Sequence, residues 1–541
     1  MNRRHPGPDP QTEAESAAPP GHRDDDQRVR ATEEARSSLT ESSEHFGTDH
    51  LVANLAARAV SGGFVTVGSQ AAKFALNLIS AAVLARLVTP EEFGVVGMVL
   101  AVTVYLGLFK EAGLSTATIQ RDKVTQAQVS NLFWINVALS GLVAALSVVL
   151  APLVAWFYRD SRIVDVMVAL SFTFVLTGST VQHNALLVRQ MRFRAIAIIE
   201  ILSLLAGIIT GASMALLHFG YWSLVGMQLC IAASALVLTW GISQWRPSLP
   251  RRGTGVAPLL KFGAHLTASD LVGRLAARAD GLLIGRYFGA APLGLYSRAN
   301  ILLARPLEQI LSPISAVVIP VLSRLQSDPD RYRQTYLRAY DTLALITLPC
   351  AALFFVLAEP LVLLILGSDW RDAAPLFAGF ALVAVTLPLS VAGSWLYLSQ
   401  GRGSDLFRTY SATGAVTVAA IVVGLRWGPL GVVLALAVAT LTVRMPIIYY
   451  LAGRRGPVRT ADLWRRFLCH APTWAVVCAV TALAHATVEE ASPIMQLLVC
   501  VPIGLAAAAA TILALRLPRS IVTYLWKNIS NSLRMQWSRA A

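Results

Sequence analysis

The stretch LARLVTPEEFGVVG (84–97) corresponds to a second stretch, IGRYFGAAPLGLYS (284–297), at an offset of two hundred positions. Each copy contains an arginine followed eight residues later by a glycine, and the two glycines are Gly94 and Gly294. Each copy also follows a long apolar segment, at the point where a spanning helix would leave a membrane. The shared pattern is short, but its recurrence at the same place in the pattern of apolar segments indicates an internal repeat.

Apolar segments of this kind recur along the whole chain after about residue 55. Only 14% of the residues are charged, whereas soluble proteins carry about 25%. About 20 consecutive apolar residues suffice to cross a bilayer as a helix. We therefore predict an all-α integral membrane protein with about fourteen spanning helices, near 60–85, 93–113, 130–156, 163–186, 195–217, 221–242, 257–287, 298–321, 338–366, 375–400, 407–425, 429–452, 467–487 and 494–516.

Six predicted helices separate the two copies of the repeat, so both halves have the same orientation in the membrane. Parallel repeats are related by an axis along the membrane normal, and transporters bind substrate where the repeats meet. Chance similarity between two short turns is the alternative explanation. The predicted divisions are a disordered cytoplasmic tail (1–54), an N-terminal six-helix lobe (55–250), a C-terminal six-helix lobe (251–455), helices 13 and 14 (456–517) and a cytoplasmic C-terminal tail (518–541).

The net charge of +14 comes from basic residues that lie mostly in the short loops between apolar segments. Alternate loops hold about twenty and about seven of these basic residues, the asymmetry of the positive-inside rule. A basic balance in a soluble protein would suggest nucleic acid, but this distribution predicts no nucleic-acid partner. We expect a multi-pass membrane protein, surrounded by membrane lipids, with both termini in the cytoplasm.

The first predicted helix carries Lys73 and several uncharged polar side chains at bilayer depth, where an ionisable group costs a few kcal/mol on insertion scales. At about 100° per residue they fall within an arc of about 80°. A polar stripe along one side of a spanning helix marks a cavity more often than a lipid-facing surface. The stripe consists of Thr66, Gln70, Lys73, Asn77 and Ser80.

Helices seven and eight carry charges at similar depth. Arg274 and Arg278 are like charges four residues apart, and Asp270 can offset only one of them. An anion between the helices would resolve this conflict, and the planar fork of arginine suits a diphosphate. Ion pairs that merely hold helices together are the alternative, and arginines near a helix end can also reach the membrane surface.

These charges define the predicted site. The residues predicted to bind a diphosphate in a cavity between the lobes are Lys73, Arg274, Arg278, Arg298, Arg305, Gln70 and Asn77. A carboxyl group in low dielectric can take up a proton near neutral pH. The residues predicted as candidates for a coupling proton or sodium ion are therefore the carboxylates Asp270, Asp280 and Glu308.

Sequence motifs of enzymes and metal sites are absent. The chain contains no HExxH, GxSxG, GxxxxGK[ST] or paired CxxC motif. Its five cysteines lie in apolar segments and are interpreted as small hydrophobic residues. We therefore predict no enzymatic activity, no metal and no cofactor.

The stretches VLARLVTPEEFGVVGMV (83–99), FGAAPLGLYSRANIL (288–302) and FKEAGLSTATIQRDKVTQAQVSNLFWIN (109–136) together resemble a known family. They are similar to Wzx-type polysaccharide and lipopolysaccharide exporters of the multidrug/oligosaccharidyl-lipid/polysaccharide (MOP) superfamily, in the colanic-acid exporter branch. The resemblance covers roughly residues 55–450 and implies two six-helix lobes around a central cavity. By helix position it also implies that Lys73, Arg274 and Arg278 meet a diphosphate. The long polar N-terminal tail departs from the family pattern.

The resemblance implies a flippase of a bacterial inner membrane that moves undecaprenyl-diphosphate-linked oligosaccharide from the cytoplasmic to the periplasmic leaflet by alternating access. The product would be exopolysaccharide, capsule or lipopolysaccharide, and the partners would be the polyprenyl-diphosphate-linked glycan and the glycosyltransferases and polymerase of the same pathway. A drug or cation antiporter of the same superfamily is the alternative, although it predicts a cavity dominated by acids and aromatics. A polysaccharide polymerase predicts a large extracytoplasmic loop, which the sequence lacks.

Overall fold

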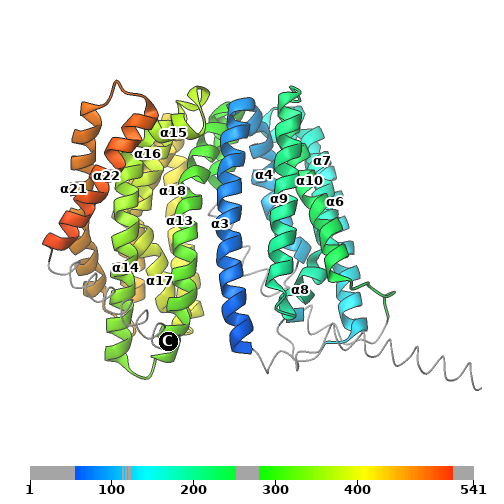
Figure 1. Ribbon diagram of the computed structural model, residues 1–541, viewed down its shortest axis with the longest axis horizontal. Coiled ribbons are helices and arrows are strands. Elements are labelled where there is room, and N and C mark those ends of the chain that lie inside the picture. Colours follow the sequence, from blue (N-terminus) through cyan, green and yellow to red (C-terminus); the bar gives the residue numbers. More distant parts are fainter. Residues whose placement is uncertain (1–54, 112–114, 116–117, 120–123, 252–278, 516–541) are drawn as a thin grey trace, which may run out of the picture.

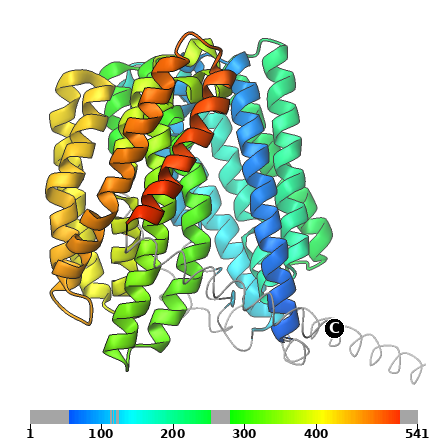
Figure 2. The same ribbon diagram turned by 60° about the vertical axis from the view of Figure 1, so that its left-hand side comes forward.

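A computed structural model describes residues 55–515 of the chain, except 112–114, 116–117, 120–123 and 252–278. The described residues are helical with short connections and form no strand. Two helical bundles stand side by side with their long helices roughly parallel (Figures 1 and 2). The two predicted tails and most of predicted helix seven lie outside the described residues.

The first bundle is built from the helices that precede residue 250, which pack mainly against one another. Thr89 and Glu92 bind each other's backbone N–H groups at the start of its second helix, and Pro90 is the first helical residue. This capping box explains why the TPEE motif begins a helix. The helices are α3 (Leu55–Leu87), α4 (Pro90–Glu111), α6 (Gln126–Tyr158), α7 (Arg162–Gly178), α8 (Val181–Arg189), α9 (Phe193–Leu216) and α10 (Trp222–Ser243).

The second bundle follows residue 278 and contains more interruptions. Its elements are α12 (Ala279–Phe288), α13 (Ala290–Arg324), α14 (Pro329–Val356), α15 (Ala358–Ile365), the 3-10 turn Ser368–Trp370, α16 (Ala373–Ala384), α17 (Leu387–Ser399), α18 (Gly403–Gly424), the 3-10 turn Leu425–Trp427, α19 (Gly428–Ala439), the π-helical turn Thr440–Arg444 and α20 (Met445–Gly453).

Two further helices, α21 (Thr460–Thr487) and α22 (Pro493–Ala514), pack against the outer side of the second bundle (Figure 1). A buried carboxylate on α14 holds α21 in place. Asp341 is 1% exposed and binds Arg466 at 2.7 Å and His470 at 2.9 Å. Because a buried charge is costly unless it is paired, these contacts fix the position of α21.

Within the described residues, eleven helical stretches are long and apolar enough to cross a membrane, against the fourteen helices predicted for the whole chain. Most of predicted helix seven lies outside the described residues, and predicted helix ten is divided into α16 and α17. The stretch Gly403–Gly453 contains two predicted helices in 51 residues. Fully helical, 51 residues would extend about 76 Å, more than twice the thickness of a bilayer core. The all-α membrane fold is confirmed, and the count of fourteen stays a prediction.

Prolines explain two of the helix breaks. Helix α14 ends at Val356, four residues before Pro360, and α16 ends at Ala384, four residues before Pro388. A proline ring clashes with the carbonyl group four residues earlier, so each helix stops upstream of the proline itself. In contrast, α13 continues through three prolines.

The two repeat glycines lie against each other where α4 crosses α13. A Cβ atom on Gly94 would overlap the carbonyl oxygen of Ala290, and a Cβ atom on Gly294 would overlap that of Pro90. Pro90 and Ala290 are themselves two hundred positions apart. Each helix therefore offers the other the same surface, so the repeat in the sequence is a two-fold relationship in space. We call these four residues the glycine crossing.

The repeat arginines extend this two-fold relationship. Arg86 of α3 donates a hydrogen bond to the carbonyl oxygen of Leu364, in the second bundle, at 2.9 Å. The guanidinium carbon of Arg286, on α12, lies 5.7 Å from the ring centroid of Phe157, in the first bundle. Each arginine thus reaches the opposite bundle beside the glycine crossing. We call this end of the molecule, defined by these four residues, the sealed end.

Substitution of Gly94 by alanine is expected to destabilise the protein by about 1–3 kcal/mol, because the helices must separate to admit the methyl group. Gly141→Ala is the matched control. It lies in helix α6, and a Cβ atom there would meet no atom within 4 Å, so the change should be neutral or stabilising by up to about 1 kcal/mol. Thermal unfolding of the purified variants measures both effects, and equal stability of the two variants would contradict the close crossing.

Candidate functional site

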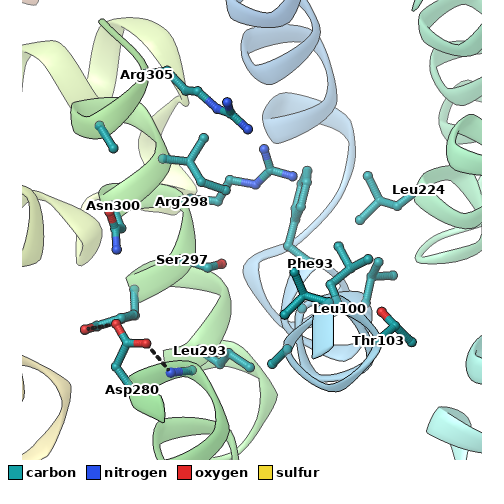
Figure 3. A pocket seen from close by; sticks show the side chains of 18 of the residues that line it. Phe93, Leu100, Thr103, Leu224, Asp280, Leu293, Ser297, Arg298, Asn300 and Arg305 are labelled. Atoms are coloured by element: carbon teal, nitrogen blue, oxygen red, sulfur yellow. Dashed lines mark hydrogen bonds between the residues drawn. The ribbon is translucent and has the colours of Figure 1, made fainter. Parts of the chain in front are cut away.

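A cavity of about 590 Å³ lies between the two bundles, lined by α4 and α10 of the first and α12 and α13 of the second. It begins next to the glycine crossing, since Phe93 and Gly97 line it from α4 and Leu293 lines it from α13. Figure 3 shows its side chains meeting in the space between α13 and α4. Its size is within the range of small-molecule sites, about 300–1,000 Å³.

Arg298 reaches across this cavity from one bundle to the other. It lies on α13, about one helical turn beyond Gly294. Its guanidinium carbon is 3.8 Å from the ring centroid of Phe93 on α4, and Figure 3 shows the two groups side by side. Within the described part of the chain, no carboxylate lies within ion-pair distance of Arg298. An aromatic ring therefore partners this intramembrane cation.

Arg305 and Glu308 form a second charged group on the same helix. Arg305 Nη1 lies 3.4 Å from Glu308 Oε2, and the two side chains are 65% and 61% exposed. Both residues line the cavity. The pair is nearly neutral as a unit, and its exposure leaves both side chains accessible to a molecule in the cavity.

Asp280 lines the cavity from α12. One carboxylate oxygen accepts a hydrogen bond from the Tyr296 hydroxyl and the other accepts one from the Gly281 backbone N–H, each at 2.8 Å. Figure 3 shows the second of these bonds beside Leu293. These neutral donors orient the carboxylate at the end of the cavity nearest the glycine crossing.

Uncharged polar groups complete the wall. Gln228 lines it from α10, Thr103 from α4, and Ser297 and Asn300 from α13. Hydroxyl and amide groups can each donate and accept hydrogen bonds. Apolar side chains such as Leu100 lie among them. The cavity thus combines two arginines, two carboxylates and neutral polar groups with apolar surface.

The residues predicted on the first helix are arranged differently. Lys73 Nζ lies 2.6 Å from Glu200 Oε2, on the neighbouring helix α9 of the same bundle. Asn77 donates to the backbone oxygen of Lys73 at 2.8 Å, and Gln70 is exposed. None of these residues belongs to the lining of the cavity. Lys73 therefore has its own acid partner in the state described.

The structure brings together four of the ten predicted site residues. Arg298, Arg305, Asp280 and Glu308 all line the cavity. The other predicted site residues of helix seven, Asp270, Arg274 and Arg278, lie outside the described residues. Among the residues that are described, no group of three histidine, cysteine or acidic side chains could hold a metal ion.

Sequence reasoning missed Phe93. Phe93 occurs in the repeat that decides the fold, but its counterpart at position 293 is a leucine, so the repeat carried no sign of its role. Its contact with Arg298 joins residues more than two hundred positions apart. Spacing along one helix cannot reveal such a contact, because periodicity reports only which residues share a face.

Comparison with known proteins places this arrangement in a family. A model of the family described as polysaccharide biosynthesis protein matches residues 83–375. The chain is 28% identical to the succinoglycan biosynthesis transport protein ExoT of Rhizobium meliloti (strain 1021) over 368 residues, which cover 66% of this chain and 73% of ExoT. It is 24% identical to the lipopolysaccharide biosynthesis protein WzxC of Escherichia coli (strain K12) over 412 residues, which cover 74% and 83%.

Solved structures establish the fold. The lipid II flippase MurJ in an inward closed conformation aligns with a TM-score of 0.67 and 15% identity, over 83% of this chain and 98% of MurJ. An inward-facing multidrug resistance MATE transporter of the MOP superfamily aligns with a TM-score of 0.57 and 16% identity, over 72% and 95%. The predicted resemblance to polysaccharide exporters is confirmed, and the solved structures show the same fold. Because the family model matches more than half of the length of this chain, the chain belongs to the polysaccharide biosynthesis protein family.

Proposed function

We propose that this membrane transporter of polysaccharide biosynthesis moves a polyprenyl-diphosphate-linked glycan from the cytoplasmic to the periplasmic leaflet, and that Arg298 binds the diphosphate. The observation that carries the proposal is the position of Arg298, a cation without a carboxylate partner among the described residues, in a cavity between the two bundles. Intramembrane charges mark substrate pathways in transporters.

The chemistry of the cavity suits this cargo. The guanidinium fork can donate two parallel hydrogen bonds to phosphate oxygens, and such charge-assisted bonds are roughly twice as strong as neutral ones. Asn300, Ser297 and Asp280 can bind sugar hydroxyls. The names of the relatives support this reading, since both ExoT and WzxC are named for polysaccharide biosynthesis.

The direction of transport follows from the loop charges. If the basic loops are cytoplasmic, the sealed end faces the periplasm and both termini lie in the cytoplasm. The cavity then takes its substrate from the cytoplasmic side while the contacts of the sealed end block the other side. Separation of the bundles at the sealed end, with closure at the opposite end, would complete alternating access about the repeat axis.

The pair of Arg305 and Glu308 suggests a route for ion coupling. A phosphate that binds Arg305 would compete with Glu308 for the guanidinium, from which Glu308 lies 3.4 Å away. Release of Glu308 from its cation on substrate binding is therefore part of the proposal, and Glu308 and Asp280 are the acidic groups of the cavity lining that can carry a coupling ion.

Arg298→Ala is expected to reduce polysaccharide export at least about tenfold, because one charge-assisted pair with phosphate is worth roughly 1.5–3 kcal/mol. Export by the Arg298→Lys variant should lie between that of Arg298→Ala and that of the original protein, because lysine keeps the charge but lacks the planar fork of arginine. Arg371→Ala is the matched control, since its side chain is 71% exposed outside the cavity. Complementation of a deletion strain at equal protein levels measures export, and full activity of Arg298→Ala would refute the assignment.

The Arg274→Ala, Arg278→Ala double variant is also expected to abolish export while the protein still inserts in the membrane. The physical reason is the like-charge pair that the sequence places on predicted helix seven. Export and membrane abundance are measured in the same complementation strain. Unchanged export would remove helix seven from the predicted diphosphate site.

The proposed orientation can be tested with single cysteines in a variant without the five native ones. Asp369→Cys at the sealed end should react with a membrane-impermeant maleimide added to spheroplasts, because Asp369 is exposed there. Ser327→Cys, exposed between α13 and α14 at the other end, should react only after permeabilisation. The reverse pattern would invert the topology.

A further inference from the structure

Phe93 lies beside Arg298, at the place where a charged group within a membrane usually has an oppositely charged partner. Its ring, 3% exposed, lies under the guanidinium of Arg298 at 3.8 Å from ring centroid to guanidinium carbon. The face of an aromatic ring attracts a cation through its quadrupole, most strongly where water is excluded. Phe93 therefore stabilises Arg298 across the interface between the bundles.

A ring and a carboxylate leave different capacities for binding. A carboxylate that pairs bidentately occupies two of the five N–H donors of a guanidinium, whereas a ring stacked on its face occupies none of the in-plane donors. A guanidinium over a ring therefore stays available to an incoming anion. Arg305 of the same cavity provides the contrast, since Glu308 lies 3.4 Å from it.

The same ring is part of the packing at the sealed end. Phe93 meets Trp370 edge to face, with ring centroids 5.3 Å apart and an angle of 73° between the planes. Trp370 is fully buried and donates a hydrogen bond from Nε1 to the backbone oxygen of Ala85 at 2.7 Å. Ala85 belongs to the first bundle and Trp370 to the second. One phenylalanine thus contacts both the cation of the cavity and a closing contact of the sealed end.

We propose that Phe93 is a positioning residue that presents Arg298 to the diphosphate, and that binding of the anion is transmitted through Phe93 to Trp370. Phosphate oxygens that bind the in-plane donors shift the guanidinium toward the anion while it stays on the face of the ring, because the two contacts use different parts of the guanidinium. The ring follows the guanidinium, and its packing against Trp370 loosens. The inference rests on the proposed function and adds that substrate binding favours opening of the sealed end.

The positioning role is tested by the binding of inorganic pyrophosphate to the full-length protein in lipid nanodiscs, measured by calorimetry. Phe93→Leu keeps an apolar side chain but removes the ring face, and we expect binding to weaken about tenfold. Phe93→Tyr keeps the face and should bind within about threefold of the original protein. Phe174→Leu is the matched control, a buried ring of the first bundle outside the lining of the cavity. Thermal unfolding of each variant shows whether it is folded.

The transmission is tested by the distance between spin labels across the sealed end. Ser161→Cys and Asp369→Cys place labels at exposed positions of the two bundles, in a variant without the five native cysteines. Pyrophosphate should shift the distance distribution to longer values in the otherwise unsubstituted protein. The shift should be lost with Phe93→Leu at saturating pyrophosphate and restored with Phe93→Tyr.

The outcomes separate this inference from the function on which it rests. If pyrophosphate does not bind the unsubstituted protein, the proposed function and the inference both fail. If Arg298→Ala abolishes binding while Phe93→Leu leaves it unchanged, the positioning role alone is wrong. If pyrophosphate binds but the label distances do not change, or change equally with Phe93→Leu, transmission through Phe93 is overturned.

Discussion

The close approach of α4 and α13 at Gly94 and Gly294 is the constraint on which the rest of the structure depends. No side chain fits between the two helices there, so the backbone of each bundle touches the other at equivalent positions. The contact closes one end of the interface, while polar and apolar side chains beyond it surround a cavity. Because the crossing is two-fold, α4 and α13 begin at equivalent positions of the repeat, Pro90 and Ala290. A transporter built this way can separate its bundles at one end only by breaking contacts gathered around these glycines.

The cavity that begins at this crossing holds its charges in two ways. Arg305 has an acid neighbour on its own helix, whereas Arg298 has a ring from the opposite bundle. A desolvated cation needs some partner, and an aromatic ring satisfies this need without consuming hydrogen-bond donors. The two arginines therefore have different partners, although the sequence alone gives no reason to rank them. Arg298 lies at the interface, where movement of the bundles would change its surroundings.

Much of the fold could be predicted from the sequence, because membrane crossing imposes long apolar segments and the repeat preserved Gly94 and Gly294. The contact between those glycines was not predicted, because the repeat shows that the two positions are equivalent but does not show that they are close in space. Arg305 and Glu308 are three residues apart on one helix, so their ion pair can be predicted from the sequence. The pair of Lys73 and Glu200 joins different helices. Such contacts depend on how helices pack, which hydrophobic periodicity does not report.

The central claim is that the cavity serves a lipid-linked glycan that must cross the membrane, and depletion of the protein tests it most directly. Lipid extracts of depleted cells would be analysed by mass spectrometry. The leaflet of the glycan would be determined by its oxidation with a membrane-impermeant reagent in spheroplasts. The account predicts accumulation of a polyprenyl-diphosphate-linked glycan that is protected from the reagent, together with loss of exported polysaccharide. A glycan equally accessible with and without the protein, with export unchanged, would contradict it.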